Sequence, residues 1–239
     1  MATQLVPLED VQRLSPLVIR ILGGNPGKFT LQGTNTYLIG TGPHRILIDT
    51  GEGLPTWTTL LSHLLTSERA TVTLALLTHW HPDHTLGVPS LRALCPSAQI
   101  FKTPSPHDPS PGYHAITPNQ TFTTEGATLR ALPTPGHTAD HTALILEQES
   151  AIFTGDAVLG HGTAVFEDLP AYMASLERMR REFAGRAYPA HGAVVEDGRA
   201  RIDDVFYNTV FKQIPLKGRP GGGEFERLNN YHNQERRVI

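Results

Sequence analysis

Four side chains of the kind that bind metals fall within six residues of this chain, directly after the short apolar segment Leu74–Leu77. They are His79, His81, Asp83 and His84. A buried strand ending at Leu77 would release the chain into a tight turn, from which two imidazoles reach one metal while the first turn of a following helix offers the other two side chains to a neighbouring point. Imidazole and carboxylate without thiolate suit zinc and other first-row divalent ions, and favour a catalytic over a structural site. The segment therefore requires a fold with a polar cleft at a strand end.

Three further candidate ligands follow, each after an apolar or strand-like stretch and beside glycine or proline. They are His137 in TPGHT, Asp156 in FTGD and His191 in YPAHG. A lone histidine in such a context is more often an ordinary loop residue. Three ligand-type residues in matching contexts indicate instead that strand ends offer them into one shared cleft.

Short apolar, β-branched runs bounded by Gly, Pro, Asp or Thr predict buried strands. The runs are Leu17–Leu22, Thr36–Ile39, Arg45–Ile48, Leu74–Leu77, Ala143–Leu146 and Ala151–Phe153. Between them, apolar residues at helical spacing predict one helix over Pro55–Leu65 and a second that follows Asp168 as N-cap and stops at Gly185. Strands mixed with helices on this scale predict an α/β fold in which helices pack outside sheet.

A length of 239 residues suits one catalytic domain. We place this domain at residues 1–202 and expect an atypical, shortened C-terminal segment at 203–239, where the apolar pattern weakens. Within that segment Leu216–Glu224 is a glycine-rich break, and the polar residues after it have helical character. The Pro- and Ser-rich Thr103–Tyr113 is predicted to be a surface loop.

Charge and cysteine content limit the possible partners and compartment. The formal net charge of −3 provides no broad basic field, which disfavours nucleic acid as a partner. The single Cys95 cannot form an internal disulfide, and the N-terminus lacks a secretory pattern, so we expect a cytoplasmic protein. No apolar run approaches the roughly 18 residues of a membrane-spanning helix, so no membrane partner is expected.

The HxHxDH pattern of residues 79–84, followed by the later His, Asp and His, resembles the metallo-β-lactamase superfamily. The resemblance covers Leu17 to about Ile202 and implies an αββα four-layer sandwich with its ligands along one edge. It also implies two ligand sets with one shared member. The first-metal set is His79, His81 and His137, the second-metal set is Asp83, His84 and His191, and the bridging residue is Asp156.

The resemblance implies two divalent metal ions as cofactors, with zinc the first expectation and manganese or iron left open. Two ions about 3.5–4 Å apart can share a bridging water and supply hydroxide near neutral pH. Asp83 would orient this hydroxide as the catalytic residue. Asp49, at a predicted strand end, would steady the ligands by hydrogen bonds, and a plain turn role for it is equally open. His141 is expected to support the site or pack in the core rather than bind metal.

The segment NPGKFTLQGTNTYLIG at residues 25–40 is similar to the fungal lactamase-like thioesterases of polyketide pathways, and more distantly to the beta-lactamase-like 2 hydrolases. This resemblance implies a thioesterase that releases an aromatic polyketide from the acyl carrier protein domain of a polyketide synthase, by attack of a metal-bridging hydroxide on the acyl thioester. Phe29 and Leu31 would suit an apolar acyl chain, or simply pack. His84 and the absence of a cysteine ligand disfavour antibiotic hydrolysis.

Three alternatives remain open. A single-stranded-RNA endoribonuclease of the same subgroup would need a basic groove with aromatic residues, and no Lys or Arg cluster flanks the ligands. A glyoxalase-II-like thioester hydrolase would share the chemistry. A metal-binding but substrate-impaired variant would follow if residues 203–239, which depart from the family's C-terminal closing segment, no longer cover the cleft.

Overall fold

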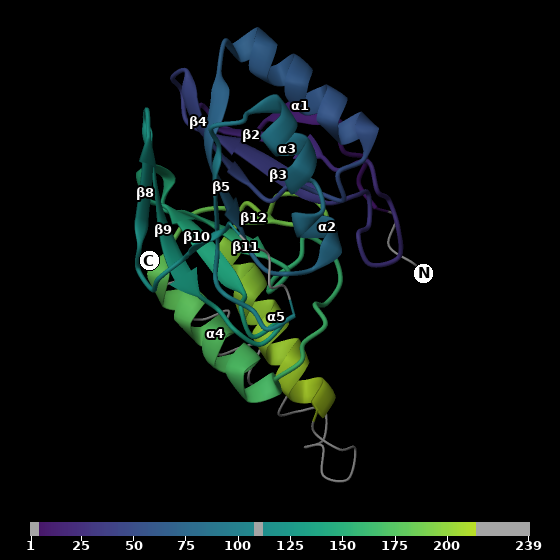
Figure 1. Ribbon diagram of the computed structural model, residues 1–239. Coiled ribbons are helices and arrows are strands. Elements are labelled where there is room, and N and C mark those ends of the chain that lie inside the picture. Colours follow the sequence, from purple (N-terminus) through teal and green to yellow (C-terminus); the bar gives the residue numbers. More distant parts are fainter. Residues whose placement is uncertain (1–4, 108–111, 214–239) are drawn as a thin grey trace.

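Two β-sheets face each other in the computed structural model, and helices cover the outer face of each sheet (Figure 1). The structure describes residues 5–107 and 112–213. The first sheet contains, in spatial order, β1 (Val11–Arg13), β2 (Val18–Leu22), β3 (Asn35–Ile39), β4 (His44–Ile48), β5 (Thr71–Leu77), β6 (Gln99–Lys102) and β7 (His114–Ala115). The second contains β12 (Ala187–Pro189), β11 (Ala151–Gly155), β10 (Thr142–Leu146), β9 (Ala127–Pro133) and β8 (Thr121–Thr124).

Apolar side chains from the two inner faces form the central core. Strands β2, β3, β10 and β11 are buried along their whole length, as expected for strands covered on both faces. In this core the Tyr37 and Phe153 rings lie 5.0 Å apart edge to face, and Phe153 stacks on Tyr188 at 4.9 Å. Tyr37 also lies 5.8 Å from Tyr188, so the Tyr37 ring joins β3 of the first sheet to β11 and β12 of the second.

The outer layers pack through two further clusters. Helices α1 (Pro55–Glu68) and α3 (Val88–Leu94) cover the first sheet, with Trp57 and Leu61 fully buried in that cluster. Helices α4 (Leu169–Glu182) and α5 (Gly198–Gln213) cover the second sheet. Two short helices, α2 (Pro82–Thr85) and η1 (Glu147–Glu149), complete the described elements. The predicted αββα sandwich is therefore confirmed.

All six predicted strand runs and both predicted helices are present. The Asp168 carboxylate caps α4 as predicted, accepting a 3.0 Å hydrogen bond from Ala171 N–H, although α4 ends before Gly185. Sequence reasoning missed β1, β6, β7, β8, β9 and β12, as well as helices α3 and α5. Most of these strands are short or carry exposed positions, so their apolar runs are weak.

Helix α5 runs across the predicted domain boundary after Ile202. Ile202 and Val205 are both buried in the cluster with α4, so the helix continues the core of the second half. The boundary itself stays a prediction. The predicted loop Thr103–Tyr113 contains no helix or strand in its described positions, while Leu216–Glu224 and the polar residues after it lie outside the described residues.

The topology brings several strand ends to one edge of the sandwich. Strands β4, β5 and β6 run parallel in the first sheet, and β11 and β12 run parallel in the second. Because carboxyl ends of parallel strands meet at one edge, the residues that follow β4, β5, β11 and β12 can meet there. None of the helices in the described part of the chain has the length and apolar content of a bilayer span.

The Trp57 side chain is the largest fully buried group in the outer layer, and its indole N–H donates to Thr36 Oγ1 at 2.9 Å. Trp57→Ala should lower the free energy of unfolding by about 3–5 kcal/mol, because it leaves a cavity and removes the indole N–H that donates to Thr36. Urea unfolding followed by circular dichroism measures the loss. Thr59→Ala, exposed on the same helix, is the control and should change stability by less than about 0.5 kcal/mol. An equal loss in both variants would contradict this account.

Candidate metal centre

The turn after β5 places four candidate ligands within one short segment. Pro82 begins α2, and its fixed φ suits the first helical position. The His84 N–H donates to His81 O at 3.0 Å and the Thr85 hydroxyl donates to the same carbonyl at 3.1 Å, so the turn is closed by its own backbone. His79 is fully buried while His81 is partly open to the cavity described below.

One cluster brings three imidazoles and a carboxylate together. His81 Nδ1 lies 2.9 Å from His79 Nε2 and 3.1 Å from His137 Nε2. His137 Nε2 lies 3.6 Å from Asp156 Oδ2. The four ligand atoms lie within 4.8 Å of one another. Sequence positions as far apart as 79 and 156 therefore meet at a single point.

A second cluster lies beside the first. His191 Nε2 is 3.2 Å from Asp83 Oδ2, and His84 Nε2 is 3.3 Å from the same oxygen. Asp156 Oδ1 lies 3.1 Å from His191 Nε2 and 3.6 Å from His84 Nε2. Asp156 thus directs one carboxylate oxygen toward each cluster, and the structure brings together all seven candidate ligands that the sequence suggested.

The donor set fits divalent cations. His137 Nδ1 donates to the Val165 carbonyl at 2.6 Å. His137 Nε2 therefore carries no hydrogen, and its lone pair points toward the other members of the first cluster. His84 Nδ1 is held 2.8 Å from Asp49 Oδ2, while His84 Nε2 and Asp156 Oδ1 are buried without a hydrogen-bond partner. Buried polar atoms without partners are costly unless a ligand satisfies them. Nitrogen and oxygen atoms without sulfur match a catalytic zinc-type site.

Charges in the centre favour ionised carboxylates. Burial acts to raise the pKa of Asp83 and of Asp156, but the adjacent histidines outweigh it and hold both pKa values far below their ordinary range. Burial also acts to lower the pKa of His191, yet Asp156 and Asp83 raise it to about 9. In His79, burial and the surrounding imidazoles lower the pKa, so that ring is neutral. The carboxylates and the neutral imidazole supply the electron pairs that a cation requires.

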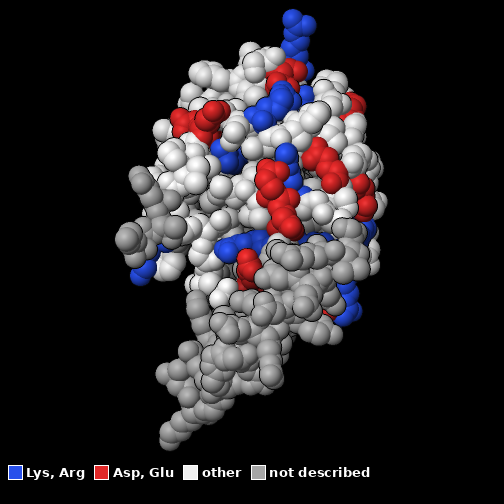
Figure 2. All heavy atoms as spheres, turned by 180° about the vertical axis from the view of Figure 1, so that it is seen from behind, with Lys and Arg blue, Asp and Glu red and all other residues white. Residues whose placement is uncertain are grey.

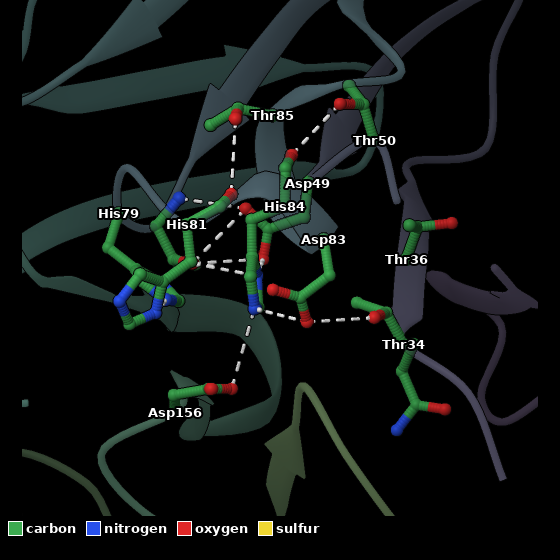
Figure 3. Close-up of polar contacts among 12 residues, drawn as sticks. Thr34, Thr36, Asp49, Thr50, His79, His81, Asp83, His84, Thr85 and Asp156 are labelled. Carbon is green, nitrogen blue, oxygen red and sulfur yellow. Dashed lines mark hydrogen bonds and ion pairs between the residues drawn. The ribbon is translucent and has the colours of Figure 1, made fainter. Parts of the chain in front are cut away.

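Asp49 contacts the centre through Thr78 and His84 (Figure 3). Its Oδ1 accepts from Thr78 N–H at 2.8 Å, and its Oδ2 lies 2.9 Å from the Thr78 hydroxyl and 2.8 Å from His84 Nδ1. With φ at 58°, Asp49 also forms the turn after β4. Asp49 therefore contacts a candidate ligand and also forms a turn, and its role as a support for metal ligands stays a prediction.

His141 lies outside both clusters. Its Nδ1 is 2.8 Å from Thr134 Oγ1, and its Nε2 accepts from the Asp156 backbone N–H at 3.1 Å. Burial, and after it the neighbouring His137, lower its pKa to about 3, so the ring is neutral and Nε2 remains an acceptor. A side chain at Gly155 would come within 2.5 Å of this nitrogen. His141 therefore supports the backbone that carries Asp156.

A buried ion pair anchors the turn that carries His137. Lys102 Nζ, at the end of β6, lies 2.8 Å from Asp140 Oδ2, and the Thr138 hydroxyl donates to Asp140 Oδ1 at 2.8 Å. Both charged side chains are almost fully buried. Since Lys102 belongs to the first sheet and Asp140 precedes β10 of the second, the pair fixes this turn across the two halves.

The centre opens into a cavity of about 660 Å³. Its wall includes five of the candidate ligands, namely His81, Asp83, His137, Asp156 and His191. Two loops form most of the rest, namely residues 28–31 between β2 and β3 and residues 159–167 between β11 and α4, and Glu52 and Pro82 complete the wall. Sequence reasoning set His161 aside as an ordinary loop histidine and did not single out Val165, yet both line this cavity. No motif in the second loop could have revealed them.

A family model described as the metallo-beta-lactamase superfamily matches residues 29–191. The lactamase-like protein ptaB of Pestalotiopsis fici is 52% identical over 200 residues, which cover 83% of this chain and 63% of that protein. The atrochrysone carboxyl ACP thioesterase of Aspergillus terreus is 54% identical over 197 residues, which cover 82% of this chain and 60% of that protein.

The chain thus spans less than two thirds of the length of these curated relatives. Among solved structures, the metallo-beta-lactamase family protein TTHA1429 of Thermus thermophilus matches with a TM-score of 0.71 at 21% identity, over 83% of this chain and 81% of that one. At that identity the match supports the fold.

Asp156→Ala should remove a carboxylate whose two oxygens lie beside different clusters. We expect bound zinc to fall from two ions per chain to one or fewer, and hydrolytic activity to be lost. Atomic emission spectrometry of the desalted protein measures the metal, and circular dichroism checks the fold. Asp204→Ala, exposed on α5, is the matched control and should retain both ions. Two tightly bound ions in the Asp156 variant would refute the shared role.

Proposed function

The chain belongs to the metallo-beta-lactamase superfamily, and from that premise we propose that it is a metal-dependent hydrolase whose substrate is an acyl thioester. More specifically, we propose that it releases an aromatic polyketide from the acyl carrier protein domain of a polyketide synthase. Several relatives of about 50% identity are named atrochrysone carboxyl ACP thioesterase, which supports this substrate class.

The proposed ligands are those that the two clusters contain. The first cation would be held by His79, His81 and His137, the second by Asp83, His84 and His191, and both by Asp156. We propose zinc as the native metal because the donors are imidazole nitrogens and carboxylate oxygens without thiolate. When bound, two such ions would supply hydroxide near neutral pH and stabilise negative charge on the substrate oxygen.

The protein's own residues orient the reaction. Asp83 lines the cavity, is held ionised by its histidine neighbours, and can accept a hydrogen bond from the attacking water. Asp49 and the Val165 carbonyl fix the rings of His84 and His137, so these ligands need not reorganise during turnover. A thioester carbonyl placed in the cavity would lie beside these groups.

The observation that carries the proposal is that apolar side chains line the same cavity as the candidate ligands. These side chains include Phe29, Leu31, Leu159, Ala164 and Val165. Phe29 and Val165 expose 69% and 64% of their surface, although they are apolar. Exposed apolar side chains beside a polar centre suit a ligand that is apolar at one end and carries a reactive carbonyl at the other.

The charges weigh against an RNA substrate. Lys28 is the one Lys or Arg among the residues that line the cavity, all of which belong to the described part of the chain, and Glu52 and Glu167 line it as well. On the face seen in Figure 2, basic and acidic side chains are interspersed and form no broad basic area. A strand of nucleic acid would meet one exposed aromatic side chain, Phe29, at this cavity but no basic groove.

A panel of three substrates distinguishes the candidate activities. Zinc-loaded protein is offered an aromatic acyl thioester of an acyl carrier protein, an acyl glutathione thioester and single-stranded RNA. We expect release of free thiol from the carrier-bound thioester at the highest kcat/KM, with no cleavage of RNA. Preferred cleavage of the glutathione thioester would leave thioester hydrolysis as the reaction but would contradict the acyl carrier protein as the carrier of the substrate. Cleavage of RNA alone would overturn the proposed function.

Phe29→Ala should weaken binding of an aromatic acyl chain without touching the metal ligands. We expect KM to rise by about tenfold, corresponding to about 1.4 kcal/mol, with a smaller change in kcat and unchanged zinc content. Steady-state kinetics with a small aromatic acyl thioester measures both constants. Val6→Ala, an exposed apolar residue outside the cavity wall, is the control. An unchanged KM in the Phe29 variant would contradict contact between Phe29 and the acyl chain.

A further inference from the structure

Thr34 contacts the second ligand cluster, although it belongs to neither cluster. It directly precedes β3, is completely buried, and its hydroxyl lies 3.1 Å from Asp83 Oδ2 (Figure 3). This is the same oxygen that lies 3.2 Å from His191 Nε2 and 3.3 Å from His84 Nε2. Thr34 therefore bonds to the atom of Asp83 that faces the other two ligands.

The amide of Asn25 is fixed against Thr34 by two hydrogen bonds. Asn25 Oδ1 accepts from the Thr34 backbone N–H at 2.8 Å, and Asn25 Nδ2 donates to Thr34 Oγ1 at 3.0 Å. Asn25 Nδ2 also donates to Glu52 Oε1 at 3.1 Å. Because a backbone N–H can only donate, its bond to Oδ1 determines which end of the amide is oxygen. The NH₂ group must then face the Thr34 hydroxyl.

This arrangement sets the direction of the bond to Asp83. A threonine hydroxyl carries one hydrogen and can also accept. Since it accepts from Asn25, its own hydrogen is free for Asp83, whose ionised carboxylate can only accept. The Thr34 hydroxyl therefore donates to Asp83, and the hydrogen bond that it accepts from Asn25 fixes this direction.

We propose that Asn25 and Thr34 form a hydrogen-bond relay that positions Asp83 as a ligand of the second cation. Both are positioning residues and neither needs to touch substrate. The inference rests on the proposed metal-dependent function. Asp83 needs such support because it lies in the one-turn helix α2 and its side chain is partly open to the cavity, where a carboxylate could rotate toward solvent.

The backbone around the relay is closed tightly. Gly23 N–H donates to Thr34 O at 2.7 Å, and the Thr30 hydroxyl donates to Asn25 O at 2.6 Å. Thr34 also forms an isolated antiparallel bridge with His191, another ligand of the second cluster. The relay is therefore built into the base of the loop that carries the cavity wall at residues 28–31.

Zinc binding by isothermal titration calorimetry, with metal content of the desalted protein as a second readout, tests the relay. Thr34→Val removes the hydroxyl at nearly constant volume. We expect one of the two zinc steps to lose affinity by about 10- to 100-fold while the other is unchanged. Thr34→Ser keeps the donor and should restore both steps. Asn25→Ala frees the hydroxyl to rotate and should weaken the same step by a smaller factor.

Thr36→Val is the matched control. Thr36 is a fully buried threonine on β3 whose hydroxyl bonds to Ile21 O and Trp57 Nε1 rather than to the centre. This variant should lower the melting temperature yet bind two zinc ions with the affinities of the starting protein. Two unaltered zinc steps in both Thr34→Val and Asn25→Ala would overturn the relay, as would equal weakening in Thr36→Val. Failure of the unsubstituted chain to bind zinc would instead refute the proposed metal centre.

Discussion

The Asp156 carboxylate is the group on which both ligand clusters depend. Its two oxygens lie near imidazoles that reach the site from α2, from the β9–β10 turn and from the end of β12. Negative charge at this point raises the pKa of His191 and offsets the mutual repulsion of the neighbouring rings. Its backbone N–H donates to His141 Nε2, so a neutral buried histidine outside both clusters supports the position of this carboxylate.

The fold class and the seven candidate ligands could be predicted from the sequence, because strands, their ends and the residues that follow them are marked by local patterns. Apolar runs ending in Gly, Pro, Asp or His mark strand ends, and parallel strand ends meet at one edge. The family resemblance is confirmed by the match over residues 29–191. The assignment of each ligand to a metal remains a proposal.

The contacts that orient the ligands could not be predicted from the sequence. The Val165 carbonyl reaches His137 through the path of the loop before α4, which lines the cavity. Every residue type has a backbone carbonyl, so the identity of residue 165 does not predict this contact. Thr34 reaches Asp83 across 49 positions, through a loop whose closure depends on the Asn25 amide. Short strands such as β7 were missed for a related reason, since pairing with a neighbour, rather than their own two residues, defines them.

The position of the centre along the edge of the sandwich has a mechanical consequence. His79 and His81 extend from the first sheet, whereas His137, Asp156 and His191 extend from the second. A cation held by both groups would bind only when the two halves are docked, so its binding free energy would add to the cohesion of the whole fold. Chelation would then loosen the sandwich at this seam first, and resistance to proteases would report how fully the protein is loaded.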